Sequence, residues 1–344
     1  MMMTTAPEQA ITEKAEGRQG RKIGVRLLFK YNALLILVVM FIVAMIISPV
    51  FLSPENMHNI LRQQSTYMLV ALGMLMVMVT GGIDLSVSSM VAVSSIMVVF
   101  SLQMWQFQMH SWGLFVSVII AIAFGFGFGC INGFLVSRLN MPAFIVTLAM
   151  MYAVKGIAYI ITNANTILLD SSIPANQVLV NFSVSDFLGL RLEIWVMFAF
   201  IAVFFFIMHF TTFGRLITAT GSNETAVQLA GINSRKYKFW AYALCGLLCG
   251  VAGVIVATHS GSATALTTQT SFDMTTIAAV VIGGASLKGG EGNVPMTVVG
   301  IFVLAIIGNI MNLVSLPIYP QLVVKAVIII LAVLLKSISS KATV

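Results

Sequence analysis

Residues 81–90, GGIDLSVSSM, place the carboxylate of Asp84 and several serine hydroxyls between two strongly apolar runs. Side chains of these types can accept hydrogen bonds from the free amides at the start of a helix, and they can also bind a polar ligand. Gly81 and Gly82 permit the tight chain reversal that must precede such a helix. We therefore interpret Asp84 as mainly structural, with Asp84 or Ser86 capping the helix that follows.

A second glycine turn, GGASLKGGEGN at 283–293, begins with Gly283 and Gly284. Pro295 follows it and suits the first turn of another helix. Both glycine turns are expected to join two membrane spans on the same side of the membrane. This repeated layout indicates a parallel internal repeat, of the kind found in many transporters.

The sequence gives little support for a catalytic or metal-binding function. Its four histidines are scattered without metal-ligand spacing, and no HExxH motif occurs. Cys130, Cys245 and Cys249 fall in apolar segments, where buried packing is the expected role. No GxxxxGK[ST] phosphate loop occurs either, so ATP must bind elsewhere if it is used. We expect no catalytic residue, no metal and no cofactor.

The composition predicts an all-α, polytopic membrane protein. The chain has 344 residues, of which 59% are hydrophobic and 8% are charged, whereas soluble domains carry about 25% charged residues. Since about 20 apolar residues span a bilayer, we place ten spans near 31–51, 66–80, 85–105, 112–137, 143–162, 194–212, 239–259, 275–285, 295–315 and 319–336. The first is expected to be a retained anchor rather than a signal peptide.

The distribution of lysine and arginine predicts the orientation, because cytoplasmic loops are enriched in both. With a cytoplasmic N-terminus, the outer loops hold only Arg62 and Arg191. The cytoplasmic segments hold fourteen cations, namely Lys14, Arg18, Arg21, Lys22, Arg26, Lys30, Arg138, Arg215, Arg235, Lys236, Lys238, Lys288, Lys336 and Lys341. Most of the net charge of +7 reflects this bias, so a nucleic-acid partner is not implied.

This orientation divides the chain into a cytoplasmic segment 1–30, a transmembrane region 31–336 and a cytoplasmic tail 337–344. The larger outer loops are 163–193 and 260–274. Lys155 and Lys325 lie within spans near their outer ends, where a lysine can extend its ammonium group to the interface.

The cytoplasmic loop 213–238, FGRLITATGSNETAVQLAGINSRKYK, predicts one short helix at 222–232. Ser222 is its expected N-cap, Glu224 lies in the first turn, and Gly231 suits the C-terminal stop. An apolar stripe is formed by Ala226, Leu229 and Ala230. Such a helix can lie on the membrane surface, or it can insert its stripe into a groove of another protein.

Five segments in order resemble the permease subunits of bacterial ABC importers of the ribose, xylose, arabinose and galactose type. They are TGGIDLSV at 80–87, NGFLVSRLNMPAFIVTLAM at 132–150, GRLITATGSNETAVQLAGI at 214–232, IAAVVIGGASLKGGEG at 277–292 and QLVVKAVIIILAV at 321–333. Two positions depart from the family pattern: Ser88 stands where glycine is usual, and Thr275 stands where an acid is usual.

The resemblance implies about ten helices per subunit in the bacterial inner membrane and a dimer of identical or different permease subunits. It further implies a separate ABC ATPase on the cytoplasmic face and a periplasmic or lipid-anchored sugar-binding protein on the outer face. The 222–232 helix would then be the coupling helix that docks into the ATPase, with the expected coupling residues Gly221, Glu224, Ala226, Leu229 and Gly231.

Transport of a neutral monosaccharide requires hydrogen-bonding groups along the pathway. The candidates that we single out are Ser88, Ser94, Asn132, Thr147 and Asn309, each of which could instead bond one helix to another. Importers of autoinducer-2 or of branched-chain amino acids share the expected architecture and remain alternatives. An ion-coupled secondary transporter is disfavoured, because the eleven acids all lie at the ends of the chain, in loops or near span ends.

Overall fold

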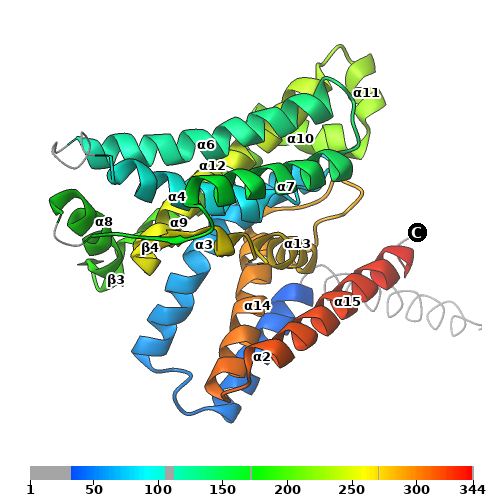
Figure 1. Cartoon of the computed structure of the whole chain (residues 1–344). Helices are drawn as coiled ribbons and strands as arrows, with labels where there is room; N and C mark the ends of the chain where they lie inside the picture. The colour runs from blue at the N-terminus through cyan, green and yellow to red at the C-terminus, as the bar shows by residue number, and fades with distance from the viewer. Residues whose placement is uncertain (1–31, 105–111, 171–172, 270, 343–344) are drawn as a thin grey trace, which may run out of the picture.

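The computed structural model describes residues 32–104, 112–170, 173–269 and 271–342, which are mainly helical (Figure 1). The expected cytoplasmic segment 1–30 and the last two residues of the expected tail lie outside this description. Each of the ten expected spans corresponds to one helix. These are α2 (Asn32–Ile47), α3 (Pro54–Val79), α4 (Val87–Leu102), α6 (Gly113–Ser137), α7 (Ala143–Thr162), α9 (Leu192–Phe210), α12 (Ser234–Ser260), α13 (Phe272–Ile282), α14 (Val294–Leu313) and α15 (Ile318–Ala342).

Not all of these helices are long enough to cross a bilayer alone. Among the described residues, five helices combine sufficient length and hydropathy, namely α6, α7, α9, α12 and α14. Helix α13 has 11 residues and is therefore about 16 Å long, roughly half of the 30 Å hydrocarbon core. Helix α3 has 26 residues but begins with a polar turn, PENMHN. Ten full crossings therefore remain a prediction.

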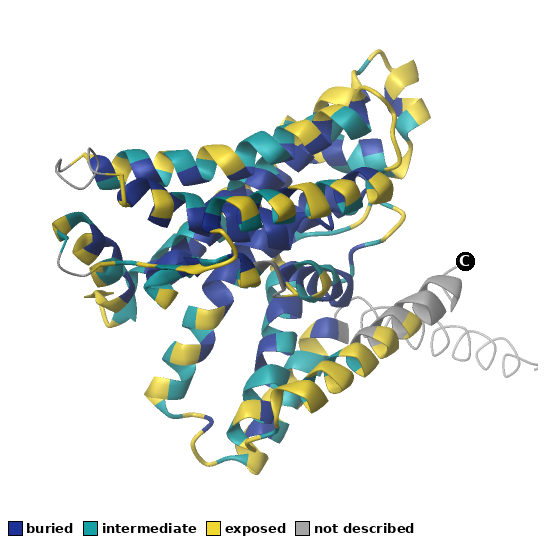
Figure 2. Cartoon of the chain, viewed as in Figure 1, coloured by how far each residue is buried: buried dark blue, intermediate teal, exposed yellow. Residues whose placement is uncertain are grey.

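Helix α12 is the buried centre of the bundle and packs against α3, α4 and α6. Figure 2 shows the buried residues gathered where these helices meet. Glycine allows the closest of these contacts: a Cβ on Gly246 of α12 would lie 2.3 Å from the carbonyl oxygen of Gly125 on α6, and one on Gly129 would lie 2.5 Å from that of Tyr242. The glycines spaced by four residues therefore pack against each other within one chain.

The two expected outer loops are joined by a small sheet. Strand β1 (Thr166–Leu168) pairs antiparallel with β4 (Ser262–Thr264). The first loop also contains α8 (Pro174–Val184) and a hairpin of β2 (Asp186–Phe187) and β3 (Leu190–Arg191), and the second loop continues as the 3-10 helix η1 (Ala265–Gln269). Since η1 contacts α4 and α7, the second loop packs onto the helical bundle.

The two ends of the bundle carry different structures. Figure 1 places α8, β3 and β4 at one end, and α10 (Thr212–Ser222) and α11 (Glu224–Leu229) at the other. At the first end the buried carboxylate of Glu193 accepts a hydrogen bond from Arg62 Nε at 2.9 Å and contacts His259 Nε2, which ties α9 to α3 and α12. The expected outer loops and the expected cytoplasmic loop are thus at opposite ends, as the topology requires.

The packing of α6 against α12 predicts a specific stability difference between two glycines of α6. Gly129→Ala should lower the melting temperature of the purified protein, because its Cβ would meet the backbone of α12 and force the helices apart at a cost of about 1–3 kcal/mol. Gly127→Ala is the matched control, since no atom lies within 4 Å of its Cβ position. Equal melting temperatures for the two variants would contradict this account of the contact.

Candidate coupling site at the glycine turns

The two glycine turns meet the end of α10 in one cluster, which we call the glycine junction: Val79, Gly81, Gly221, Gly289 and Gly290. The Gly290 amide donates a hydrogen bond to the Val79 carbonyl at 2.9 Å. Gly81, Gly289 and Gly290 have φ values of +84°, +89° and +77°, a region that residues with a side chain rarely adopt. Segments from α3, α10 and the α13–α14 connection therefore touch at this point.

The junction has no space for a side chain at its centre. A Cβ on Gly221 would lie 1.8 Å from the Val79 carbonyl oxygen and 2.6 Å from the Gly290 nitrogen. A Cβ on Gly289 would lie 2.8 Å from the Gly81 nitrogen. The contact is therefore backbone against backbone. The second glycine turn begins with Gly283, which lies against the start of α14, where its Cβ would be 2.4 Å from the Met296 carbonyl oxygen, and with Gly284, which has a φ of +90°.

The helix expected at 222–232 begins later and is shorter than expected. Ser222 is not its N-cap but the last residue of α10; Asn223 caps α11 instead, accepting from the Ala226 amide at 2.9 Å. Asn223 has the extended backbone of a cap residue, with φ −157° and ψ 93°, and so it separates the two helices. Gly231, with a φ of +76°, follows the end of α11 as expected.

Helix α11 presents its apolar stripe outward. Val227 is buried against the bundle, whereas Leu229 is 85% exposed. Ala226 and Ala230 are exposed on the same stripe. A single exposed leucine is common on protein surfaces. Here all three residues of the predicted apolar stripe are exposed, so the stripe is available to contact another molecule.

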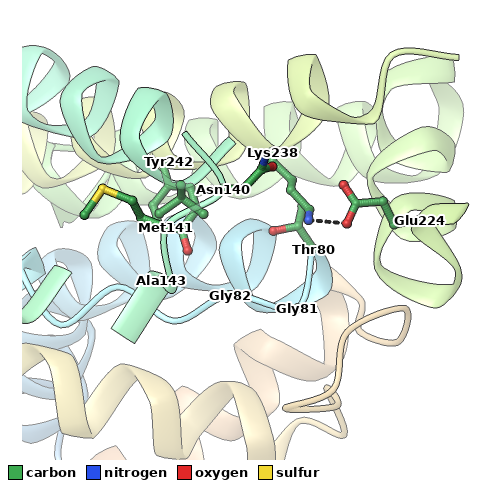
Figure 3. Close-up of a pocket in the computed structure, with 10 residues that line it drawn as sticks. Thr80, Gly81, Gly82, Asn140, Met141, Ala143, Glu224, Lys238 and Tyr242 are labelled. Atoms are coloured by element: carbon green, nitrogen blue, oxygen red, sulfur yellow. Dashed lines mark hydrogen bonds and ion pairs between the residues drawn. The ribbon is translucent and has the colours of Figure 1, made fainter. Parts of the chain in front are cut away.

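Glu224 attaches α11 to α12. Lys238 Nζ lies 2.5 Å from Glu224 Oε2 (Figure 3). The Ser234 hydroxyl donates to Glu224 Oε1 at 3.0 Å. Partial burial raises the pKa of Glu224, but Lys238, Ser234 and the charge of Arg235 together outweigh it and hold the pKa below its ordinary value. The carboxylate is therefore ionised at neutral pH, and the ion pair is lost only as the pH falls through this lowered pKa.

Asp84 holds the first glycine turn, but not as a helix cap. Its Oδ1 accepts from the Ser86 amide at 2.9 Å and from the Ser86 hydroxyl at 2.5 Å. Ser86 occupies the N-cap position of α4, yet its side chain makes no capping hydrogen bond. Asn132 of α6 donates to the Ser86 hydroxyl at 2.9 Å, and Thr147 of α7 donates to the Ile83 carbonyl at 3.2 Å. The buried turn is thus bonded to two further helices.

Of the remaining pathway candidates, Ser88 and Asn309 bond one helix to another, whereas the Ser94 hydroxyl has no hydrogen-bond partner among the described residues. Ser88 donates to Asp273 at 2.9 Å, which joins α4 to the start of α13. Asn309 exchanges two hydrogen bonds with Asn56, at 2.7 and 3.1 Å, which joins α14 to α3. Ser94 is buried where α4 approaches Gly253 of α12. A pathway role for any of these residues stays a prediction.

Lys238, the partner of Glu224, and Tyr242 are not among the site residues expected from the sequence. Opposite charges within residues 213–238 are the only sequence signal for the ion pair. Tyr242 lies in an apolar run and has the pattern of a core aromatic residue. Within the described parts of the chain, no group of three or more His, Cys, Asp or Glu side chains is placed to hold a metal ion. The glycine junction and the Glu224–Lys238 pair join several helices, and this arrangement is suited to transmitting movement between them.

Comparison with known proteins identifies relatives along most of the chain. The family described as "Branched-chain amino acid transport system / permease component" matches residues 56–333. The ribose import permease protein RbsC of Escherichia coli (strain K12) is 35% identical over 308 residues, covering 89% of this chain and 93% of that protein.

Two further relatives show the same extent of similarity. The ribose import permease protein RbsC of Bacillus subtilis (strain 168) is 36% identical over 333 residues, covering 94% of this chain and 98% of that protein. The L-arabinose transport system permease protein AraH of Escherichia coli (strain K12) is 33% identical over 313 residues, covering 91% and 92%. No solved structure matches the chain significantly.

Proposed function

The chain belongs to the family of branched-chain amino acid transport system permease components, and we propose that it forms the translocation pathway of an ATP-driven importer for a monosaccharide. The observation that carries this proposal is the similarity to two ribose permeases and one arabinose permease over about nine tenths of the chain. The family description names amino acids, so a branched-chain amino-acid importer is the main competing assignment. An autoinducer-2 importer has the same architecture.

We predict that the reconstituted importer takes up ribose or arabinose and not leucine. The experiment uses proteoliposomes with the full-length permease, its ATPase and its binding protein, and it measures uptake of labelled sugar or leucine with and without ATP. ATP-dependent leucine uptake without sugar uptake would contradict the assignment. Sugar uptake driven by an ion gradient without the ATPase would instead indicate a secondary transporter.

The protein is a multi-pass membrane protein, and in this family the ATPase is a separate subunit. We propose the bacterial inner membrane, with both termini and the 213–238 loop cytoplasmic and residues 31–336 as the permease domain. Support comes from the excess of lysine and arginine on one side and from the placement of α11 and the β1–β4 sheet at opposite ends. Labelling of Gln228→Cys in intact cells by an impermeant thiol reagent would contradict this orientation.

Three partners follow from the proposal. The ATPase would bind the end of the molecule that carries α11, and a periplasmic or lipid-anchored binding protein would deliver sugar to the end that carries α8 and the β1–β4 sheet. A second permease subunit, identical or different, would complete the pathway. Closure of the ATPase would displace α11, and the Glu224–Lys238 pair and the glycine junction would carry that displacement to α12, α3 and the α13–α14 connection.

We predict that Leu229→Asp separates the permease from its ATPase. The exposed Leu229 would enter an apolar groove of the ATPase, and a carboxylate placed there without a partner costs several kcal/mol, or about a hundredfold in affinity. The measurements are co-purification with the ATPase and ATP hydrolysis stimulated by the loaded binding protein.

Thr225→Asp is the control, since Thr225 is exposed on α11 but lies outside the apolar stripe. It should retain both activities. If Leu229→Asp retains them too, α11 is not the docking element, and a helix resting on the membrane surface would be the better description.

A further inference from the structure

A cavity of about 300 Å³ lies beside the first glycine turn, at the end of the bundle that carries α11. Its walls are the 80–82 turn, the 140–143 segment after α6, and the side chains of Val136, Glu224, Lys238 and Tyr242 (Figure 3). Its volume is at the lower end of the range of about 300–1,000 Å³ that is typical of small-molecule sites. The proposed transport pathway gives no role to this cavity.

Tyr242 contributes an unpaired hydroxyl to the cavity. The side chain is completely buried, and its oxygen makes no hydrogen bond with any other described residue. Gly82 leaves the space that this hydroxyl occupies, since a Cβ there would lie 2.2 Å from the oxygen. The neighbouring Thr80 hydroxyl donates to the Val77 carbonyl at 2.7 Å and is not the missing partner. A buried hydroxyl that bonds nothing is unfavourable, so a ligand that bonds it gains affinity.

The cavity favours a neutral ligand. Lys238 and Glu224 are both in its wall, but they neutralise each other at 2.5 Å. The other polar residues of the wall are Thr80, Asn140 and Tyr242, beside the backbone of the two glycines, while Val136, Met141 and Ala143 supply apolar surface. Uncharged hydrogen-bonding groups beside apolar surface match the hydroxyl-rich edges and the C–H faces of a monosaccharide.

We propose that this cavity is a cytoplasmic-side binding site for a monosaccharide of the transported class, with the Tyr242 hydroxyl as its buried hydrogen-bonding group. The inference rests on the proposed function for the class of ligand and for the side of the membrane. A bound sugar would contact both the 80–82 turn and the ion pair that attaches α11 to α12. The site is therefore placed where departure of the sugar and movement of the coupling helix involve the same side chains.

The test is saturation-transfer NMR with D-ribose and the full-length permease in lipid nanodiscs, a method suited to weak binding. Tyr242→Phe should weaken ribose binding about three- to tenfold, the effect of losing one hydrogen bond. Its melting temperature should be no lower than that of the unaltered protein, because the deleted hydroxyl bonds no described residue. Tyr237→Phe is the matched control: Tyr237 also lies on α12, but it packs against Phe213 and does not line the cavity. It should leave ribose binding unchanged.

Absence of a ribose signal, or an equal signal from the unaltered protein and Tyr242→Phe, would overturn the proposal. Uptake by the complete importer separates this failure from failure of the proposed function. ATP-driven ribose uptake without binding at the cavity would leave the function standing and remove the site. Binding that depends on Tyr242, in an importer that takes up leucine and no sugar, would support the cavity as a site and refute the transported class.

Discussion

The end of the bundle that carries α11 depends on the approach of Gly221 to the carbonyl of Val79 and the amide of Gly290. No residue larger than glycine fits at 221 without moving the backbone, so the end of α10 lies directly on the end of α3 and on the α13–α14 connection. Three segments that are distant in the sequence thereby become one unit. Helix α11 follows α10 immediately, so a force on α11 reaches this unit through a short and closely packed path.

Polar side chains extend this connection through the bundle. Glu224 joins α11 to α12 through Lys238, and α12 is the buried helix around which α3, α4 and α6 pack. The bonds from Asn132 and Thr147 to the 83–86 turn, and from Ser88 to Asp273, hold α6, α7 and α13 to the same region. In an apolar environment these groups must be bonded internally. Several polar residues that were candidates for contacting the solute are therefore needed to hold the helices together.

The positions of the ten helices could be predicted from the sequence, because apolar runs between loops are a local property. The exposed stripe of α11 could also be predicted, since its period is helical. The predicted start of α11 at Ser222 was wrong. Ser222 and Asn223 both have side chains that can cap a helix, and only the backbone conformation determines that Asn223 is the cap. The glycine junction, the β1–β4 pair and the Glu224–Lys238 pair join distant segments. The local sequence does not predict which glycine will contact which carbonyl group. It also does not predict that the Tyr242 hydroxyl lines a cavity.

The most direct test of the glycine junction as the route of coupling is ATP hydrolysis by a complex that carries Gly221→Ala. The complex should still assemble, because the exposed stripe of α11 is unaltered, but stimulation of ATP hydrolysis by the loaded binding protein should fall at least severalfold. Gly156→Ala, a change on α7 with no atom within 4 Å of its Cβ position, should behave as the unaltered protein. Full stimulation in an assembled Gly221→Ala complex would contradict the account.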